Sequence, residues 1–256
     1  MSSPKKIVVI GGSGLIGTKV VALLKADGHD ALAASPSTGI NVYTGEGLDA
    51  ALAGADAVID TSNLLSFERD VVRDFFGTCS RNLAAAGKQA GVRHHVVLSI
   101  VGTDGLVSNP YLDGKMAQEA EVRSSGAPYT IVRATQFFEF LSTLAEAYTS
   151  DGVMRVPAIS FQPIAADDVA ALLVKTALST PKNGILDIAG PELASFKAIM
   201  QDYLAGTPNA PDVIADKSVS YFGATVTESS LVPNRSATLG HTTVREWLDR
   251  RSKTAA

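Results

Sequence analysis

A tyrosine and a lysine stand four residues apart in the chain, at Tyr111 and Lys115. Residues at this spacing share one face of a helix, so both side chains can point into a single cleft. An ammonium group close to a phenol favours the phenolate and lowers the pKa of the tyrosine from about 10. Such a tyrosine can give a proton to a carbonyl oxygen as hydride arrives, or take it back in oxidation. The pair predicts proton transfer coupled to carbonyl chemistry, with both residues catalytic.

A glycine-rich segment near the N-terminus has the spacing of a dinucleotide-binding turn. In such a turn an early glycine makes the tight bend, the next lets the backbone approach a pyrophosphate, and the last packs helix against strand. The phosphates then lie at a helix N-terminus, where free N–H groups and the helix dipole favour negative charge. We predict that the cofactor is bound by Gly11, Ser13, Gly14, Leu15, Ile16 and Gly17.

The residues after the second predicted strand bear on the choice between NAD and NADP. Enzymes that use NAD place an Asp or Glu there to bind the ribose 2′-hydroxyl. This chain has Ser35, Pro36, Ser37 and Thr38 instead. No carboxylate is present to repel a 2′-phosphate, and the hydroxyl groups can donate hydrogen bonds to it. The arginine that usually binds this phosphate is also missing. NADP(H) is therefore favoured over NAD(H), with Ser35 and Ser37 as contacts.

Further polar and aromatic residues follow the third and fifth predicted strands. Ligands of doubly wound folds bind at the carboxyl ends of the strands, so residues there are candidates for the site. Phe137 and Phe138 stand at helical spacing from Leu141, which is typical of core residues, although one of them could line the substrate pocket. The predicted cofactor contacts are Thr61, Ser62, Asn63 and Thr135, and the predicted substrate contacts are Gln136, Phe137, Phe138 and Phe161.

The elements that must position these residues alternate between strand and helix signals over the first 140 residues. Lys5–Ile10 is a β-branched run typical of a strand buried on both faces, and Leu15–Ala26 has the apolar spacing of a helix. Repeated units of this length predict a doubly wound, Rossmann-like parallel sheet covered by helices. The last third is less regular. We expect residues 1–256 to form a single domain, with a small substrate lobe drawn mainly from 150–256.

Several of these stretches together resemble a known family. The glycine turn, the strand ending at Ser99, and Tyr111-x-x-x-Lys115 resemble the short-chain dehydrogenase/reductase superfamily. The segments 128–133, 162–170 and 188–191 are similar to its atypical, NmrA-like NAD(P)H-binding branch. The resemblance implies that Lys115 holds the nicotinamide ribose, that Ser99 is catalytic through a hydrogen bond to the substrate oxygen, and that Asn41 contacts the adenine.

Composition excludes other classes of protein. With 22 basic and 26 acidic residues the net charge is −4, which gives no general attraction to nucleic acid or anionic membranes. Cys79 is the only cysteine, and no metal-ligand spacing is present, so we expect neither disulfides nor a metal site. No segment has the apolar length of a signal peptide or membrane span. We expect a cytoplasmic monomer or homodimer.

These observations predict an NAD(P)H-dependent oxidoreductase of the short-chain type. Hydride would pass to or from a small carbonyl, enone or quinone-like substrate, with Tyr111 handling the proton. Two alternatives stay open. One is an NmrA-like nucleotide-sensing regulatory protein without turnover. The other is a sugar-nucleotide epimerase or dehydratase, which is disfavoured by the small lobe and by the lack of an acidic residue near Ser35.

Overall fold

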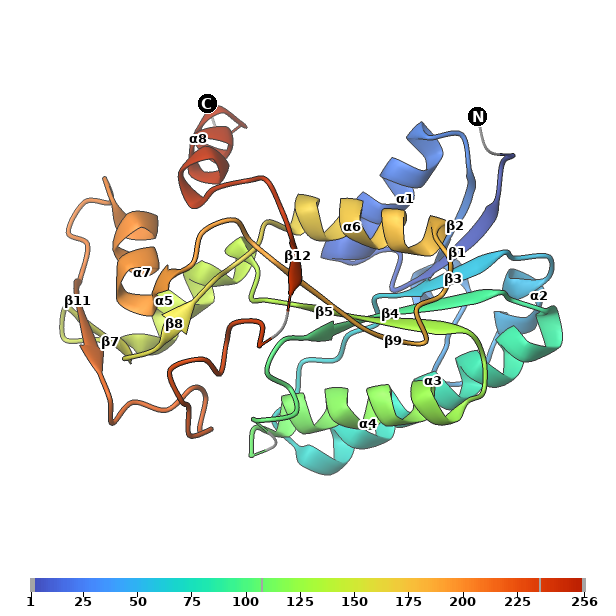
Figure 1. Cartoon of the computed structure of the whole chain (residues 1–256), viewed down its shortest axis with the longest axis horizontal. Helices are drawn as coiled ribbons and strands as arrows, with labels where there is room; N and C mark the ends of the chain where they lie inside the picture. The colour runs from blue at the N-terminus through green and yellow to red at the C-terminus, as the bar shows by residue number, and fades with distance from the viewer. Residues whose placement is uncertain (1–2, 107, 235, 255–256) are drawn as a thin grey trace.

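The computed structural model describes residues 3–106, 108–234 and 236–254, which are built around one large parallel sheet (Figure 1). Its strands are β1 Lys6–Ile10, β2 Asp30–Ala34, β3 Ala57–Asp60, β4 His94–Ile100, β5 Tyr129–Ala134, β9 Gly184–Ala189 and β12 Ala237–Leu239. They lie in the order β12-β9-β5-β4-β3-β1-β2. Every neighbouring pair runs parallel, so all carboxyl ends lie at one edge.

Helices cover both faces of this sheet, as Figure 1 shows. The helices of this part are α1 Leu15–Ala26, the short 3-10 helix η1 Pro36–Thr38, α2 Leu48–Leu52, α3 Arg69–Ala90, α4 Pro110–Ser124 and α6 Ala166–Leu178. Helices α1 and α6 lie on one face, and α3 and α4 lie on the other. The predicted doubly wound Rossmann-like fold is confirmed.

The alternation of side chains along β1 explains why both faces are covered. Ile7 and Val9 pack into the core beneath α1 and α6. Val8 and Ile10 point the other way, into a second core that also contains Leu83 and Cys79 of α3. Because successive strand residues face opposite sides, an unbroken apolar strand requires a helical layer on each face.

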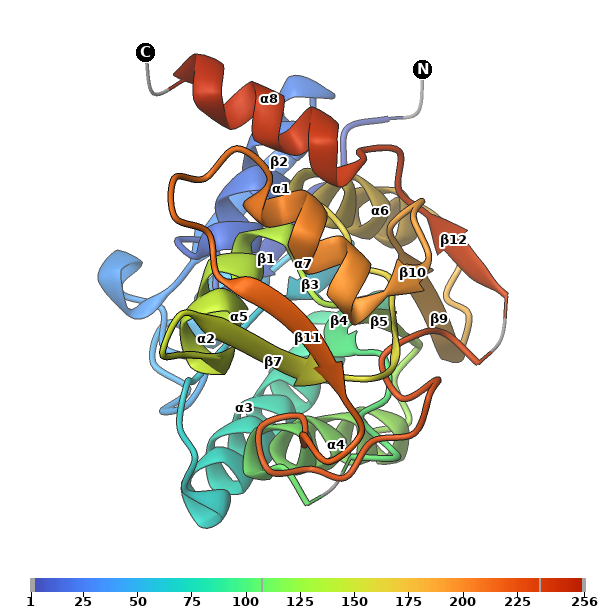
Figure 2. The same cartoon turned by 90° about the vertical axis from the view of Figure 1, so that its left-hand side faces the viewer.

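The remaining elements form a small lobe at the carboxyl edge of the sheet (Figure 2). They are the 3-10 helix η2 Phe138–Phe140, α5 Leu141–Tyr148, β6 Thr149–Ser150, β7 Val153–Pro157, β8 Ser160–Phe161, β10 Ala194–Ser195, α7 Phe196–Leu204, β11 Asp212–Asp216 and α8 Val244–Thr254. Strands β11, β7 and β6 make a three-stranded sheet, and β10 pairs with β8. The lobe has its own apolar core. The chain enters this core directly after β5, where η2 contributes the buried side chain of Phe138.

Two adjacent acidic residues stand at the start of α6 without capping it. Asp167 and Asp168 lie inside the first turn of α6, and the N-cap is Ala165. The Asp168 carboxylate accepts hydrogen bonds from the backbone N–H groups of His241 and Thr242, at 2.9 and 2.8 Å. Asp168 therefore fastens the segment that leads into α8, a long-range contact that no local pattern encodes.

Within residues 3–106, 108–234 and 236–254, no helix is long and apolar enough to cross a membrane. The same residues contain no group of three or more His, Cys, Asp or Glu side chains placed to hold a metal ion.

Candidate active site

The glycine turn between β1 and α1 is built by close backbone contacts. Gly11 has a φ of +72°, and a Cβ atom on it would lie 2.7 Å from the carbonyl oxygen of Thr61. A Cβ on Gly17 would lie 2.2 Å from the carbonyl oxygen of Gly11, so no side chain fits there. Gly14 differs, because its Cβ would meet only the Gly11 oxygen, at 3.3 Å. Gly11 and Gly17 thus shape the turn, while Gly14 keeps its outer side open.

The N-terminus of α1 is available to an anion. Ser13, Gly14 and Leu15 are exposed at the surface of the turn, whereas Ile16 is buried against the sheet. Among the described residues no side chain caps this helix. The backbone N–H groups of a first turn lack intrahelical partners, so this end of α1 favours a phosphate.

Three buried polar atoms close to the carboxyl edge have no hydrogen-bond partner within the described part of the chain. They are Ser62 Oγ after β3, and Thr135 Oγ1 and Gln136 Oε1 after β5. Buried polar groups are nearly always paired, so orphaned atoms at one edge indicate a polar ligand. Together with the open side of Gly14, they fit a nicotinamide dinucleotide, which carries many donors and acceptors.

The neighbouring residues of the β3 edge are already engaged. Thr61 Oγ1 donates to the carbonyl oxygen of Ile10 at 2.7 Å, so its hydroxyl proton ties β3 to β1. Asn63 Oδ1 accepts a hydrogen bond from the phenol of Tyr111 at 2.8 Å. The loop predicted to contact the cofactor therefore reaches the predicted catalytic tyrosine.

At the end of β2, hydroxyl groups bond to one another. The oxygens of Ser35 and Ser37 lie 2.8 Å apart, and Ser35 is almost fully buried. The Ser35 N–H donates to Thr38 Oγ1 at 3.0 Å, which closes η1. Asn41 Oδ1 accepts from the N–H of Tyr43 at 3.0 Å within its own turn. The Ser35 and Ser37 hydroxyls therefore lie side by side, and the Asn41 side chain stabilises a local turn.

Tyr111 and Lys115 share one face of α4, but their polar ends point to different partners. Burial raises the pKa of Tyr111 to about 12. The Lys115 ammonium donates to the carbonyl oxygen of Leu98 at 2.7 Å and lies 4.6 Å above the Phe76 ring. The Phe76 ring also packs edge-to-face against the Tyr111 ring, with centroids 5.9 Å apart. The expected lowering of the Tyr111 pKa by Lys115 is therefore wrong for this arrangement.

The charge of Lys115 belongs to a buried chain of polar side chains. Lys115 donates to Gln118 Oε1, and Gln118 Nε2 donates to Asp60 at 3.0 Å. Asp60 in turn accepts from the backbone N–H of Ser62 at 2.9 Å. Burial lowers the pKa of Lys115 to about 8, although the carboxylates of Asp60 and Glu119 oppose this shift.

Gln118 and Asp60 were not among the predicted site residues. A carboxylate that ends a fully buried apolar strand was the available signal for Asp60. A polar residue three positions after Lys115, on the same helix face, was the signal for Gln118.

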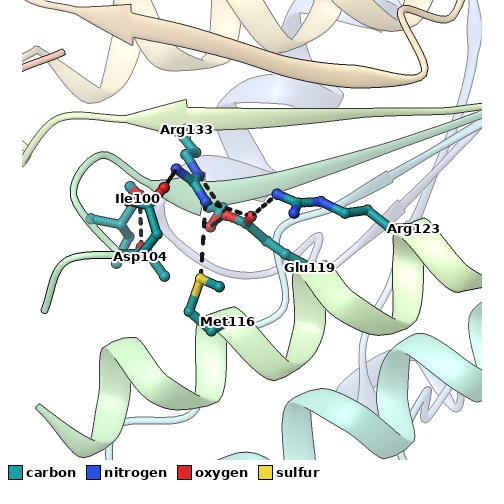
Figure 3. A network of polar contacts seen from close by, with 8 residues as sticks. Ile100, Asp104, Met116, Glu119, Arg123 and Arg133 are labelled. Atoms are coloured by element: carbon teal, nitrogen blue, oxygen red, sulfur yellow. Dashed lines mark hydrogen bonds and ion pairs between the residues drawn. The ribbon is translucent and has the colours of Figure 1, made fainter. Parts of the chain in front are cut away.

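Ser99 belongs to a separate ionic network under α4, shown in Figure 3. Its hydroxyl donates to Glu119 at 2.6 Å, and Arg133 contacts both oxygens of that carboxylate at 2.8 Å. Arg123 adds a further contact to Glu119, and Arg133 also donates to Asp104 at 2.8 Å. Glu119 is 0% exposed. Because its only proton is committed to Glu119, Ser99 does not match the predicted bond to a substrate oxygen.

Two of the predicted substrate contacts are core residues. Phe138 and Phe161 are fully buried in the lobe, where Phe161 stacks on Phe196 with ring centroids 4.3 Å apart. Neither ring can face a substrate, so their assignment is corrected. Phe137 is partly buried and packs against the core beneath α1 and α6. Of this group, Gln136 retains an orphaned atom suited to a ligand.

Comparison with known proteins identifies related sequences and folds. A family described as NAD(P)H-binding matches residues 11–180. The chain is 31% identical to the (4-alkanoyl-5-oxo-2,5-dihydrofuran-3-yl)methyl phosphate reductase of Streptomyces griseus, over 73% of this chain and 68% of that protein. It is 30% identical to an NAD(P)H azoreductase of Xenophilus azovorans, over 74% and 69%. A short-chain dehydrogenase/reductase superfamily structure from Agrobacterium tumefaciens, with bound NAD, has a TM-score of 0.71 at 19% identity and covers 98% of each chain.

Proposed function

The chain belongs to the NAD(P)H-binding family, as its resemblance to atypical short-chain dehydrogenase/reductases predicted, and we propose that it is an NADPH-dependent reductase. Its substrate is a small carbonyl, enone or quinone-like compound. The observation that carries this proposal is the contact of the Tyr111 phenol with Asn63, on the loop whose neighbour Ser62 offers an orphaned atom to the cofactor. The similarity to two reductases supports the same chemistry.

In this proposal each group of residues has a distinct task. The turn from Gly11 to Gly17 and the N-terminus of α1 bind the pyrophosphate. Ser62, Thr135 and Gln136 satisfy their orphaned atoms on the nicotinamide half, where Lys115 binds the ribose. The bound cofactor supplies the hydride.

Tyr111 supplies the proton to the oxygen of the substrate. A phenol whose pKa is raised to about 12 stays protonated near neutral pH, so it is suited to donate rather than to accept. Asn63 holds the hydroxyl in position until the substrate oxygen replaces it as acceptor. This protonation state favours reduction over oxidation as the working direction.

The choice of NADPH rests on the hydroxyl pair at the end of β2. Ser35 and Ser37 lie side by side where a carboxylate would repel a 2′-phosphate, and their hydroxyls can turn toward it. A Ser37→Asp variant should weaken NADPH binding by about tenfold or more while NADH binding changes little. Titration of both nucleotides by fluorescence tests this choice, and tighter NADH binding by the wild type would contradict it.

The catalytic proposal is tested with the variant Tyr111→Phe. Consumption of NADPH against a panel of carbonyls, enones and quinones should fall by roughly a hundredfold or more, because a positioned proton donor is lost. The dissociation constant for NADPH should stay within about twofold. Unchanged turnover in the variant would remove Tyr111 from the mechanism. A wild type that binds NADPH but consumes none would favour the nucleotide-sensing alternative.

A further inference from the structure

A tight turn in the lobe carries an aromatic residue in an unfavourable backbone conformation. Tyr221 and Ala224 exchange backbone hydrogen bonds of 2.9 and 3.0 Å across the turn. Its central residues Phe222 and Gly223 have φ values of +46° and +84°. Turns with two left-handed central residues strongly prefer Asn-Gly, because a bulky side chain is strained there. Phe222 therefore occupies a position where a smaller residue would be more stable.

The turn is fastened on both sides, to the lobe and to the start of α4. The Phe222 N–H donates to the Tyr148 hydroxyl of α5 at 3.3 Å. Its carbonyl oxygen accepts from Asn109 Nδ2 at 3.4 Å. Asn109 is the N-cap of α4 and holds the N–H of Tyr111 at 2.9 Å. One residue thus links the strained turn to the predicted proton donor.

The ring of Phe222 belongs to an aromatic cluster of the lobe. Its centroid lies 5.6 Å from Tyr148, 6.0 Å from Phe140 and 5.1 Å from Tyr221. Phe222, Phe140 and Tyr148 are only partly buried, and they pack against the same apolar cluster as Tyr111. A partly exposed ring gains less from packing than a buried one, so packing alone does not account for the strain.

Strained residues that persist in a fold concentrate where function requires their placement. The geometry points to Phe222 as a specificity-determining residue of the substrate site, where its ring stacks on planar, conjugated substrates held near Tyr111. This assignment rests on the proposed reductase function and refines it, because it selects quinones and other extended planar acceptors over small aliphatic carbonyls. The rings of Phe140 and Tyr148 pack against it.

The test measures ligand binding with NADP⁺ bound, so that no hydride can be transferred. Calorimetry compares naphthoquinone, which is planar and bicyclic, with cyclohexenone, which lacks an aromatic face. Phe222→Asn should weaken naphthoquinone binding by about tenfold and cyclohexenone binding by less than twofold, because only the stacking partner is removed. Asn tolerates the left-handed conformation, so the urea midpoint of this variant should stay the same or rise. Phe222→Tyr, the matched control, should retain wild-type binding of both ligands.

Equal losses for the two ligands, or no loss for naphthoquinone, would overturn the assignment. So would a wild type that does not bind naphthoquinone. If Phe222→Asn fails to fold, Phe222→Leu decides the matter, because it keeps the apolar bulk and removes only the aromatic face. NADPH consumption is measured separately on the same proteins. A wild type that binds naphthoquinone through Phe222 yet consumes no NADPH would refute the proposed function and leave the assignment of Phe222 standing.

Discussion

The ammonium group of Lys115 is buried, and its side chain is only 4% exposed. Burial lowers its pKa to about 8 from the ordinary value of 10.5. Below pH 8 both the folded and the unfolded chain carry this charge. Between pH 8 and 10.5 the unfolded chain binds the extra proton, so the contribution of Lys115 to the free energy of unfolding should rise with pH in this window.

Urea unfolding of the wild type and of Lys115→Met, followed from pH 7 to 10, isolates this contribution. The rise with pH should be present in the wild type and absent in the variant. Lys88→Met, which removes an exposed lysine of α3, should keep the wild-type slope and serves as the control. In the same window turnover should fall, because the group that is proposed to bind the ribose loses its charge. Parallel slopes in all three proteins would show that Lys115 does not titrate there.

The Glu119 side chain is wholly buried. Its carboxylate forms ion pairs with Arg123 and Arg133 and accepts a hydrogen bond from Ser99. Glu119→Ala would leave the buried Arg133 without its main partner, which should cost about 3 kcal/mol or more of unfolding free energy. Glu121→Ala is the matched control, because Glu121 lies two positions further along α4 and pairs with Arg81 at the surface, at 2.6 Å. That change should cost less than about 1 kcal/mol. Similar urea midpoints for the two variants would contradict this account of the network.

At the scale of the elements, substitutions at Gly14 and Gly17 of the first turn should separate folding from binding. Gly17→Ala places a Cβ 2.2 Å from the Gly11 oxygen, so α1 must shift and stability should drop by a few kcal/mol. Gly14→Ala meets that oxygen only at 3.3 Å and should fold nearly normally. Its methyl group lies on the open side of the turn, so NADPH binding should weaken. Thermal melting and nucleotide titration measure the two effects, and a stable Gly17→Ala that binds NADPH normally would refute them.

Elements with a regular apolar period could be predicted from the sequence. The helix at Leu15–Ala26 has the expected bounds, and the strand expected at Lys5–Ile10 begins one residue later, at Lys6, because both elements bury apolar side chains in the core of the sheet domain. Strands β11 and β12 were missed. They are short, only partly buried, and paired to β7 and β9 over long sequence distances, so local periodicity does not reveal them.

The candidate site was predictable to the extent that strand ends determine it. The carboxyl ends of β1, β3 and β5 brought the predicted residues to one edge, and Tyr111 contacts Asn63 there. Side-chain direction was not predictable in the same way. Ser99 turns to Glu119 because a buried Arg133 on the neighbouring strand requires that carboxylate, and this pairing spans three separate elements.

At the scale of the whole molecule, the lobe depends on a C-terminal anchor. Trp247 of α8 packs 5.7 Å from the Phe138 ring, and its indole N–H donates to Glu139 at 3.1 Å. The other oxygen of Glu139 accepts from the N–H of Ala166 at the start of α6, at 3.1 Å. The Glu139 carboxylate therefore joins α8 of the lobe to α6 on the sheet, in addition to the contact that Asp168 makes.

Trp247→Ala should destabilise the protein by about 3 kcal/mol, because a large ring that is 7% exposed is removed from the lobe core. Circular dichroism during urea unfolding measures this loss. Trp247→Phe, which keeps an aromatic ring but loses the bond to Glu139, should recover about half of it. Loss of less than about 1 kcal/mol in the alanine variant would show that α8 is peripheral to the lobe.

Trp247 is the only tryptophan in the chain, which gives the molecule a built-in optical probe. Its emission arises from the lobe alone, whereas circular dichroism averages over all helices and strands. Because indole emission overlaps the absorption of a reduced nicotinamide ring, energy transfer between them would report the distance from the lobe to the cofactor. Cofactor binding by the wild-type protein can thus be followed without any added label.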